Sequence, residues 1–262
     1  MSGHDENRQS ETRSGRDRAS PARPWVVRQE WRDVLFAHWA VNPSALRRLL
    51  PHGLAVDTYH GAAYVGVIPF RIPSFRLRWL PPVPGLDAFD ELNVRTYVTT
   101  PLGPGVFFFS LDATSRLAVK AARRFYHLRY HEAAITIARE GDWIHYRSVR
   151  KGEMAAAMMD VRYRGIGEAS EAATGTLERW LVERYRLYTV GPAGRLRRAE
   201  IDHAPWRLRQ AEGTFKTNTM ASAMGIGLPS TRPVLHFADA SGPVYTWPLA
   251  QTIPAAMPRT QR

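Results

Sequence analysis

The sequence predicts a single α+β domain built on a mostly antiparallel β-barrel or sandwich, with one central helix packed against it. Many segments alternate apolar and polar residues, which is typical of half-buried strands. One segment, Ser115 to Leu128, instead shows helical periodicity. The chain has 262 residues, 44% of them hydrophobic, and no internal repeat or linker divides it. One large core is therefore expected.

The domain is expected to span residues 25–250. Residues 1–24 are polar, rich in Ser, Arg, Asp and Glu, and lack an apolar stretch, so we expect a disordered tail and not a secretory signal. Residues 251–262 are expected to form a flexible tail. No stretch reaches the ~20 apolar residues of a membrane span. The chain has no cysteine, which excludes disulfides and thiolate metal sites. The predicted location is cytoplasmic.

The elements of the N-terminal half follow from these patterns. The first strand is expected at Trp31–Trp39, and a short helix opens at Asn42-Pro43-Ser44, where Pro suits a first helical turn. Strands are expected at Leu54–Tyr59 and Ala62–Arg71, around a turn at His60-Gly61. The stretch Ile72–Leu86 is rich in Pro and aromatic residues, and an ordered loop is expected there.

The central helix, Ser115 to Leu128, is expected to pack through Leu117, Ala121, Phe125 and Leu128. We expect a strand pair at Ala133–Arg139 and Trp143–Lys151 and a further strand at Asp160–Gly165. The segment Thr176–Tyr188 is expected to be helical or half helical. After it we expect two segments that flank a loop, Leu196–Ala199 and Trp206–Glu212, and two short strands within Pro233–Trp247.

The most informative segments are Glu91–Val98 and Val106–Asp112, which read as a hairpin of two alternating strands. If their apolar faces match, Asn93 lies opposite Asp112 and Arg95 lies opposite Ser110. Five polar side chains then converge on one surface: Glu91, Asn93, Arg95, Ser110 and Asp112. A sheet does not need such a cluster for stability, so a functional site is predicted there.

In such a site Arg95 is a fixed cation for a carboxylate or an enolate, because guanidinium pairs with carboxylate bidentately. Glu91 or Asp112 could act as general acid or base, with a pKa set by burial. His38 could face the same interior. An equally weighted alternative is a satisfied salt-bridge network that lines a sheet face.

Other chemistries find little support. His127 and His131 are one turn apart if the helix continues, but no HExxH motif accompanies them, and a polar helix face is preferred to a metal site. No Gly-x-Ser-x-Gly elbow or glycine-rich phosphate loop is present. The net charge is +12 with only three lysines, of which Lys120 is expected to be exposed. No arginine-rich run is interleaved with aromatic residues, so nucleic acid is not expected as a partner.

Several motifs resemble the YqjF-like family of uncharacterised bacterial proteins. They extend from about Trp31 to Trp247: Trp31–Trp39, Leu49-Leu-Pro-His-Gly-Leu54, Leu80–Leu86, Phe89–Val98, Phe107–Ala113, Ser115–Ala118, Arg184–Tyr188, His203-Ala-Pro-Trp206 and Pro233–His236. That family is similar to the acetoacetate decarboxylase-like superfamily. The resemblance implies a double-barrel-like β core that encloses a polar pocket, with a helix beside it.

In the decarboxylases of that superfamily a lysine forms a Schiff base, a second lysine depresses its pKa, and a glutamate and an arginine assist. Glu91 matches the glutamate. The place of the lysine pair reads Leu128-Arg-Tyr-His131, which contains no lysine. Schiff-base decarboxylation is therefore not expected, and Tyr130 and His131 are expected near the pocket.

We therefore expect a polar pocket for a small oxygenated or anionic molecule, with lyase, hydratase or enolisation chemistry. The alternatives are a binding protein without turnover and an interaction protein with a basic surface. A homo-oligomer is left open, and no metal or cofactor is expected. The candidate catalytic residues are Glu91, Arg95, Tyr130 and His131, and the candidate binding residues are His38, Asn93, Ser110, Asp112 and Arg116.

Overall fold

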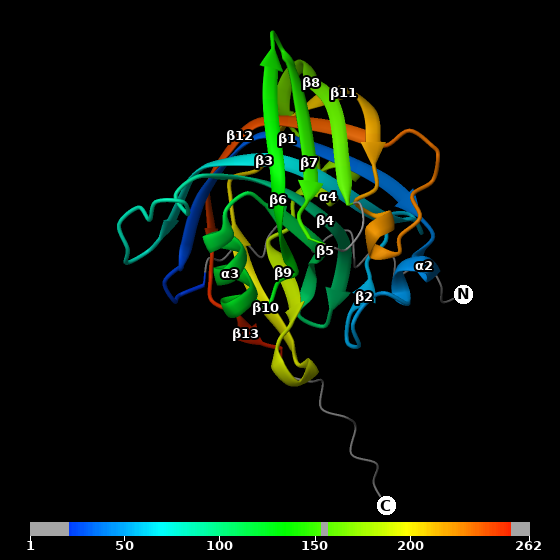
Figure 1. Cartoon of the computed structure of the whole chain (residues 1–262). Helices are drawn as coiled ribbons and strands as arrows, with labels where there is room; N and C mark the ends of the chain where they lie inside the picture. The colour runs from blue at the N-terminus through cyan, green and yellow to red at the C-terminus, as the bar shows by residue number, and fades with distance from the viewer. Residues whose placement is uncertain (1–20, 153–156, 253–262) are drawn as a thin grey trace, which may run out of the picture.

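The computed structural model describes residues 21–152 and 157–252, and they form mostly sheet with few helices (Figure 1). The tails predicted at 1–24 and 251–262 lie outside the described residues except for 21–24 and 251–252. The boundaries of a single domain at 25–250 stay a prediction.

Within the described residues thirteen strands form one sheet. They are β1 (Val27–Val41), β2 (Ala55–Val56), β3 (Ala63–Leu77), β4 (Phe89–Thr100), β5 (Gly103–Ala113), β6 (Tyr130–Glu140), β7 (Trp143–Arg150), β8 (Met158–Glu171), β9 (Arg186–Val190), β10 (Leu196–Asp202), β11 (Arg207–Asn218), β12 (Val234–Thr246) and β13 (Ala250–Gln251). The helices are α2 (Pro43–Arg47), α3 (Arg116–Phe125) and α4 (Leu177–Val182), with 3-10 turns η1 (Pro192–Gly194) and η2 (Ser222–Met224).

The strand order is β13-β10-β9-β5-β6-β7-β8-β11-β12-β1-β3-β4-β2. Two additional pairings, β4 with β5 and β10 with β12, join strands that are distant in this order, so the sheet wraps around its interior. Among the described strands β5 runs parallel to β6 and to β9, and the other pairs are antiparallel. Parallel neighbours need a crossover, and α3 provides it between β5 and β6.

The sheet buries two apolar cores. The first core includes Leu35, Val65, Leu92, Val94, Phe107, Phe109, Tyr146 and Val161. The second core includes Phe36, Ile68, Phe70, Tyr97, Val119, Leu181 and Trp206. Strand β4 is buried on both faces and sends alternate side chains into the two cores.

Several predicted elements are confirmed. Asn42 caps α2, Ser115 caps α3 through the amide of Ala118, and β6 and β7 form the expected strand pair. The segment 176–188 is half helical, with α4 followed by β9.

Other expectations are wrong. The strands are not all short: β1 and β3 have 15 residues each, and β3 continues to Leu77 into the expected loop. The two strands expected at 233–247 are one strand, β12. Register shifts in β1 let this long strand bend, so it need not end where the sheet curves.

The expected packing face of the central helix is also wrong. Ala118 and Val119 are buried, whereas Leu117 and Phe125 are 46% and 67% exposed. Small residues on the inner side let the helix lie close to the strands that it connects. The helix ends at Phe125, and His127 has a φ of 52°, which turns the chain toward β6. His127 and His131 are therefore not on one helix, contrary to the expected spacing.

Candidate functional site

The register of β4 and β5 differs from the expected one. Asn93 lies opposite Leu111, and Arg95 lies opposite Phe108. A register shift between Val94 and Arg95 leaves Phe109 without a counterpart, which is the pattern of a β-bulge. Side chains of a strand point to opposite faces of the sheet in turn. The extra residue therefore changes the face to which the side chains of β5 point on one side of the bulge.

The five predicted polar residues therefore lie on two faces. Ser110 and Asp112 pair with Val94 and Leu92, so they point toward the first core. The other three lie on the opposite face of β4, together with Tyr97, which belongs to the second core. We call this row the second-core face of β4: Glu91, Asn93, Arg95 and Tyr97.

Glu91 lies at one end of the second-core face and is only 4% exposed. The Tyr130 hydroxyl donates a hydrogen bond to Glu91 Oε2 over 2.8 Å. Burial raises the pKa of Glu91 to about 8, the Tyr130 hydrogen bond opposes the rise, and the charge of Asp112 adds to it. The Glu91 carboxyl is therefore largely protonated at neutral pH.

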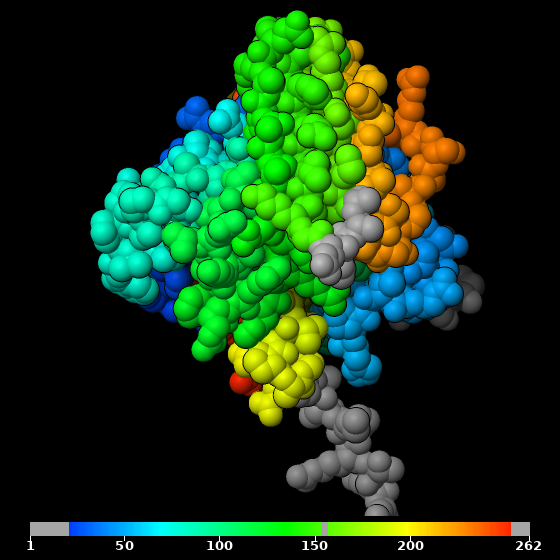
Figure 2. All heavy atoms as spheres, in the orientation of Figure 1, coloured from blue at the N-terminus to red at the C-terminus, as the bar shows by residue number. Residues whose placement is uncertain are grey.

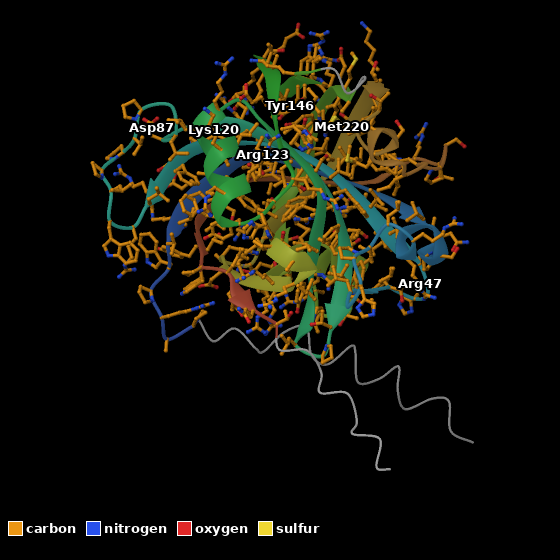
Figure 3. The ribbon with its side chains drawn as sticks, turned by 60° about the horizontal axis from the view of Figure 1, so that its bottom comes forward. Arg47, Asp87, Lys120, Arg123, Tyr146 and Met220 are labelled. Carbon is orange, nitrogen blue, oxygen red and sulfur yellow. The ribbon has the colours of Figure 1, made fainter. Side chains whose placement is uncertain are left out.

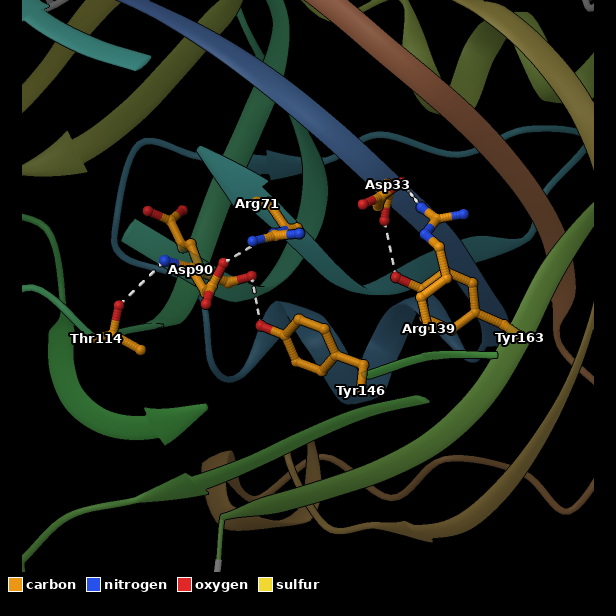
Figure 4. Close-up of polar contacts among 8 residues, drawn as sticks. Asp33, Arg71, Asp90, Thr114, Arg139, Tyr146 and Tyr163 are labelled. Atoms are coloured by element: carbon orange, nitrogen blue, oxygen red, sulfur yellow. Dashed lines mark hydrogen bonds and ion pairs between the residues drawn. The ribbon is translucent and has the colours of Figure 1, made fainter. Parts of the chain in front are cut away.

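Contacts of Tyr146, Thr114 and Arg71, which Figure 4 draws, hold the backbone around Glu91. The Tyr146 hydroxyl donates to the carbonyl oxygen of Glu91 over 2.8 Å. At the preceding residue the amide of Asp90 donates to Thr114 Oγ1, and the Asp90 carboxylate lies 3.4 Å from Arg71 Nε. These contacts fix the position from which the Glu91 side chain projects.

Arg95 and His38 form a second group, farther along the same face. Arg95 is 6% exposed, and its Nη2 donates to the carbonyl oxygen of Leu181 over 3.2 Å. The Tyr97 hydroxyl lies 2.6 Å from His38 Nε2, and the Arg95 guanidinium lies 5.7 Å from the centre of the Tyr97 ring. Burial lowers the pKa of His38 well below its usual 6.5, and the charge of Arg95 adds to this effect.

This second group has unsatisfied hydrogen-bonding capacity. Among the described residues Arg95 forms no ion pair with a carboxylate. Three buried atoms, Arg95 Nε, His38 Nδ1 and Asn93 Oδ1, have no hydrogen-bond partner within residues 21–152 and 157–252. A buried cation without a counterion is costly, so this group is suited to receive an anion.

A cavity of about 250 Å³ is lined by Glu178, Gln210 and His236, among others, and it is separate from the group of Arg95, His38 and Asn93, none of which lines it. The His236 ring is 2% exposed, and its Nε2 lies 3.9 Å from Glu178 Oε1. His236 pairs with Phe36 across β1 and β12, and its charge contributes to the lowered pKa of His38. Helix α4 connects the two places, because it carries both Glu178 and Leu181.

Asp112 is engaged elsewhere. Arg150 Nε and Nη2 donate to the two Asp112 carboxylate oxygens over 2.6 and 2.7 Å, and both side chains are buried. His131 pairs with Asp112 across β5 and β6 and is half-buried. Burial lowers the pKa of His131, and the nearby Arg150 charge adds to this effect. Asp112 compensates Arg150, which leaves Glu91 as the carboxyl available for proton transfer.

The remaining predicted residues lie apart. Ser110 is buried with its hydroxyl unpartnered. Arg116 is exposed on α3, where its Nε lies 3.0 Å from Glu132 Oε2. The structure thus brings Glu91 to Tyr130, Arg95 to His38 and Asp112 to His131, and it places Arg116 on the outer surface.

Sequence reasoning missed Arg150, Tyr146 and His236. The sequence of β7 contains a pattern that could have identified Arg150. It follows Ile144, Tyr146 and Ser148 at every second position, so this arginine lies on the buried face of the strand. His236 likewise stands on a strand between apolar residues.

All three lysines of the chain, Lys120, Lys151 and Lys216, are exposed, so none of them lies in either core. Within residues 21–152 and 157–252 no group of three or more His, Asp or Glu side chains is arranged to hold a metal ion. No helix in the same residues is long and apolar enough to cross a membrane.

Known structures with the same fold include two kinds of enzyme. The enduracididine biosynthesis enzyme MppR complexed with pyruvate is 13% identical, with a TM-score of 0.63, over 89% of this chain and 92% of the other. Acetoacetate decarboxylase from Legionella pneumophila is 12% identical, with a TM-score of 0.59, over 90% and 92% of the two chains.

The sequence is 47% identical to the uncharacterized protein YqjF of Bacillus subtilis (strain 168) over 225 residues, which are 86% of this chain and 92% of YqjF. Residues 28–242 match the DUF2071 family, described as "Uncharacterized conserved protein (COG2071)". The chain therefore belongs to the DUF2071 family, is a relative of YqjF, and shares the fold of the acetoacetate decarboxylases.

Proposed function

We propose that this protein binds a small oxygenated, anionic organic molecule on the second-core face of β4 and transfers a proton to it. The reaction class is that of a lyase, a hydratase or an enolising enzyme, without a Schiff base. One observation carries the proposal. The same buried strand face holds a cation that has no carboxylate partner in the part of the chain that the structure describes and, four residues away, a carboxyl with a raised pKa.

Arg95 is the group that binds the anion. Its guanidinium is fixed by the Leu181 carbonyl and lies beside the rings of Phe36 and Tyr97. A ligand carboxylate would supply the missing counterion and accept a hydrogen bond from Arg95 Nε. Neutral His38 and the Asn93 amide can then orient the rest of the ligand, because each has a buried polar atom free to form a hydrogen bond.

Glu91 is the proton donor. In decarboxylation of an oxo acid the C–C bond to the carboxylate breaks, CO₂ leaves, and the oxo oxygen takes up a proton as the enol forms. In enolisation and dehydration water removes the proton on the α-carbon, while the oxo oxygen or the leaving hydroxyl takes up the donated proton. A carboxyl that is protonated at neutral pH can supply this proton. The Tyr130 hydroxyl then donates to the carboxylate that is left and stabilises it. Asn93 stands between Glu91 and Arg95, and about 13 Å of strand separates the two Cα positions.

The fold neighbours support the class of ligand. The name of the MppR structure states a complex with pyruvate, and the name of the decarboxylase states that it acts on acetoacetate. Pyruvate and acetoacetate are both small oxo acids. At 12–13% identity these neighbours show the fold alone. A Schiff base would need a lysine in the site, and the three lysines of this chain are exposed. We propose that the two wrapped parts of the sheet enclose the ligand as a double barrel would.

The test is a turnover assay on acetoacetate and pyruvate followed by proton NMR in D₂O. We expect decarboxylation of acetoacetate or methyl-proton exchange of pyruvate above the rate in buffer, with a loss of activity above a pH of about 8 as Glu91 ionises. Glu91→Gln should abolish the rate, and Glu140→Gln, at an exposed carboxyl, should leave it unchanged. A Glu91→Gln protein with the full rate would refute this role of Glu91.

Two further measurements separate the steps. Calorimetric titration with pyruvate should show binding to the wild type, loss of binding in Arg95→Met, and unchanged binding in Arg47→Met, at an exposed arginine. Borohydride added with the oxo acids should trap no adduct. A stable adduct on a lysine would refute chemistry without a Schiff base.

Binding without turnover is the second candidate function, and the buried position of both groups favours it. It predicts that Arg95→Met abolishes binding of pyruvate although neither oxo acid is converted by the wild type.

A further inference from the structure

Four large apolar side chains are exposed in two segments of the protein that contact each other. Trp79 is 69% exposed, Phe125 67%, Leu80 51% and Leu117 46%. Two belong to the loop 78–88 between β3 and β4, and two belong to α3. Water contact with so much apolar area is unfavourable, and such patches mark interaction sites.

The loop and α3 are joined into one surface. The Ser115 hydroxyl at the start of α3 donates to the carbonyl oxygen of Gly85 in the loop. A methyl group placed on Gly85 would lie 3.9 Å from Leu117 Cδ1. The space-filling view shows the loop and the helix side by side (Figure 2). We call this region the α3 surface.

The α3 surface is also strongly basic. Helix α3 carries Arg116, Lys120, Arg123 and Arg124 and contains no acidic residue. At 100° per residue, Lys120 and Arg124 share the outer side of the helix with Leu117, opposite the buried Ala118. Neither Lys120 nor Arg124 forms an ion pair with any carboxylate of the described residues.

The stability of the helix explains only part of these charges: Arg123 and Arg124 stand in the last turn, where a positive charge complements the helix dipole, but Lys120 and Arg116 do not. Arg116 stands in the first turn, where a positive charge opposes the helix dipole, and no acidic residue offsets it in that turn. Exposed aromatic and aliphatic side chains beside unpaired basic ones form the pattern that binds the surface of an anionic membrane.

We propose that the α3 surface docks on an anionic lipid bilayer. Trp79, Leu80 and Phe125 enter the headgroup region, and Lys120 and Arg124 contact lipid phosphates. A second copy of the chain is a poor occupant, because it would bring the same positive charge to the contact. The contact is peripheral, and it depends on neither Glu91 nor Arg95.

The test is co-sedimentation of the full chain with large unilamellar vesicles at about 0.1 M salt, where surface charges act over ~10 Å. We expect binding to phosphatidylcholine vesicles that contain phosphatidylglycerol and no binding to phosphatidylcholine alone. Lys120→Gln and Arg124→Gln should each lower the partition coefficient roughly fivefold. The double variant Trp79→Ser/Phe125→Ser should lower it at least about tenfold.

The matched controls are Arg47→Gln, on the side of the molecule away from Lys120 and Arg123 (Figure 3), and Leu102→Ser, at the turn between β4 and β5. Both remove a side chain of the same kind from the outer surface and should leave vesicle binding unchanged. All these positions are exposed, so circular dichroism should show folded protein throughout. Glu91→Gln should also bind vesicles normally, which separates this inference from the proposed function.

Absence of binding to anionic vesicles would overturn the inference. An equal loss in Arg47→Gln would overturn it as well, because the net charge of +12 alone would then account for binding. Capture by immobilised polyaspartate without vesicle binding, if lost in Lys120→Gln, would show that the partner is an acidic protein.

Discussion

Replacing Glu91 by Gln should make the protein more stable at neutral pH, by an amount that grows with pH. Below its usual pKa of 4.5 the carboxyl is neutral in both the folded and the unfolded chain. Between 4.5 and about 8 the unfolded chain releases the proton while the folded protein keeps it. The unfolded state then binds fewer protons, so the stability of the wild type falls as pH rises. Glutamine cannot ionise and has no such loss.

The size of the effect follows from the two pKa values. Each pH unit in this interval contributes about 1.4 kcal/mol, which gives about 3 kcal/mol at pH 7 and about 5 kcal/mol above pH 8. These figures are ceilings, because the folded protein can relax around an ionised group. The amide oxygen of Gln can still accept the Tyr130 hydrogen bond, so the two proteins should be nearly equal in stability near pH 4.5.

The assay is urea denaturation of both proteins at several pH values from 4.5 to 8.5, followed by circular dichroism. The quantity of interest is the difference in free energy of unfolding between the variant and the wild type, because other titrating groups cancel in it. Glu140→Gln, at an exposed carboxyl, is the control and should give a small difference that changes little with pH. A difference for Glu91→Gln that does not grow with pH, or a variant that is less stable at neutral pH, would refute the burial argument.

Three further predictions concern stability. The pKa of His38 lies well below 6.5 in the folded state, so the unfolded chain binds more protons below that pH. The stability of the protein therefore falls as the pH falls. His38→Gln should remove this part of the pH dependence in acid denaturation. Asp112→Asn should cost about 3–5 kcal/mol in urea denaturation, because it leaves Arg150 buried without its partner; a loss below about 1 kcal/mol would contradict this account. Gly105→Ala should cost about 1–3 kcal/mol, because its methyl group would lie 2.7 Å from a backbone carbonyl oxygen of the neighbouring strand, whereas Gly227→Ala meets nothing within 4 Å and should change the melting temperature little.

The functional predictions have different readouts, so they can fail separately. Turnover and ligand binding test Glu91 and Arg95 on the second-core face, and vesicle binding tests the α3 surface. The stability of Glu91→Gln tests the environment of the carboxyl alone and needs no substrate.

The candidate site was partly predictable because alternation along a strand is local. The sequence of β4 places Glu91, Asn93 and Arg95 at every second position, and the structure keeps all three on one buried face. The resemblance to the acetoacetate decarboxylase-like superfamily placed Tyr130 near the predicted pocket, and in the structure its hydroxyl contacts the Glu91 carboxyl. The division of the site could not be predicted, because a bulge adds one residue to β5 without a sequence signal that fixes its position.

By itself the sequence determined a mostly antiparallel sheet, a helix that begins at Ser115 and a strand with one polar face, since periodicity depends on neighbouring residues. Only the tertiary structure decided which polar groups meet. Asp112 pairs with Arg150, 38 residues away, and Arg95 contacts the Leu181 carbonyl, 86 residues away. The packing of α3 against the sheet likewise decided that Phe125 faces outward. Such choices depend on contacts between distant segments, which no local pattern records.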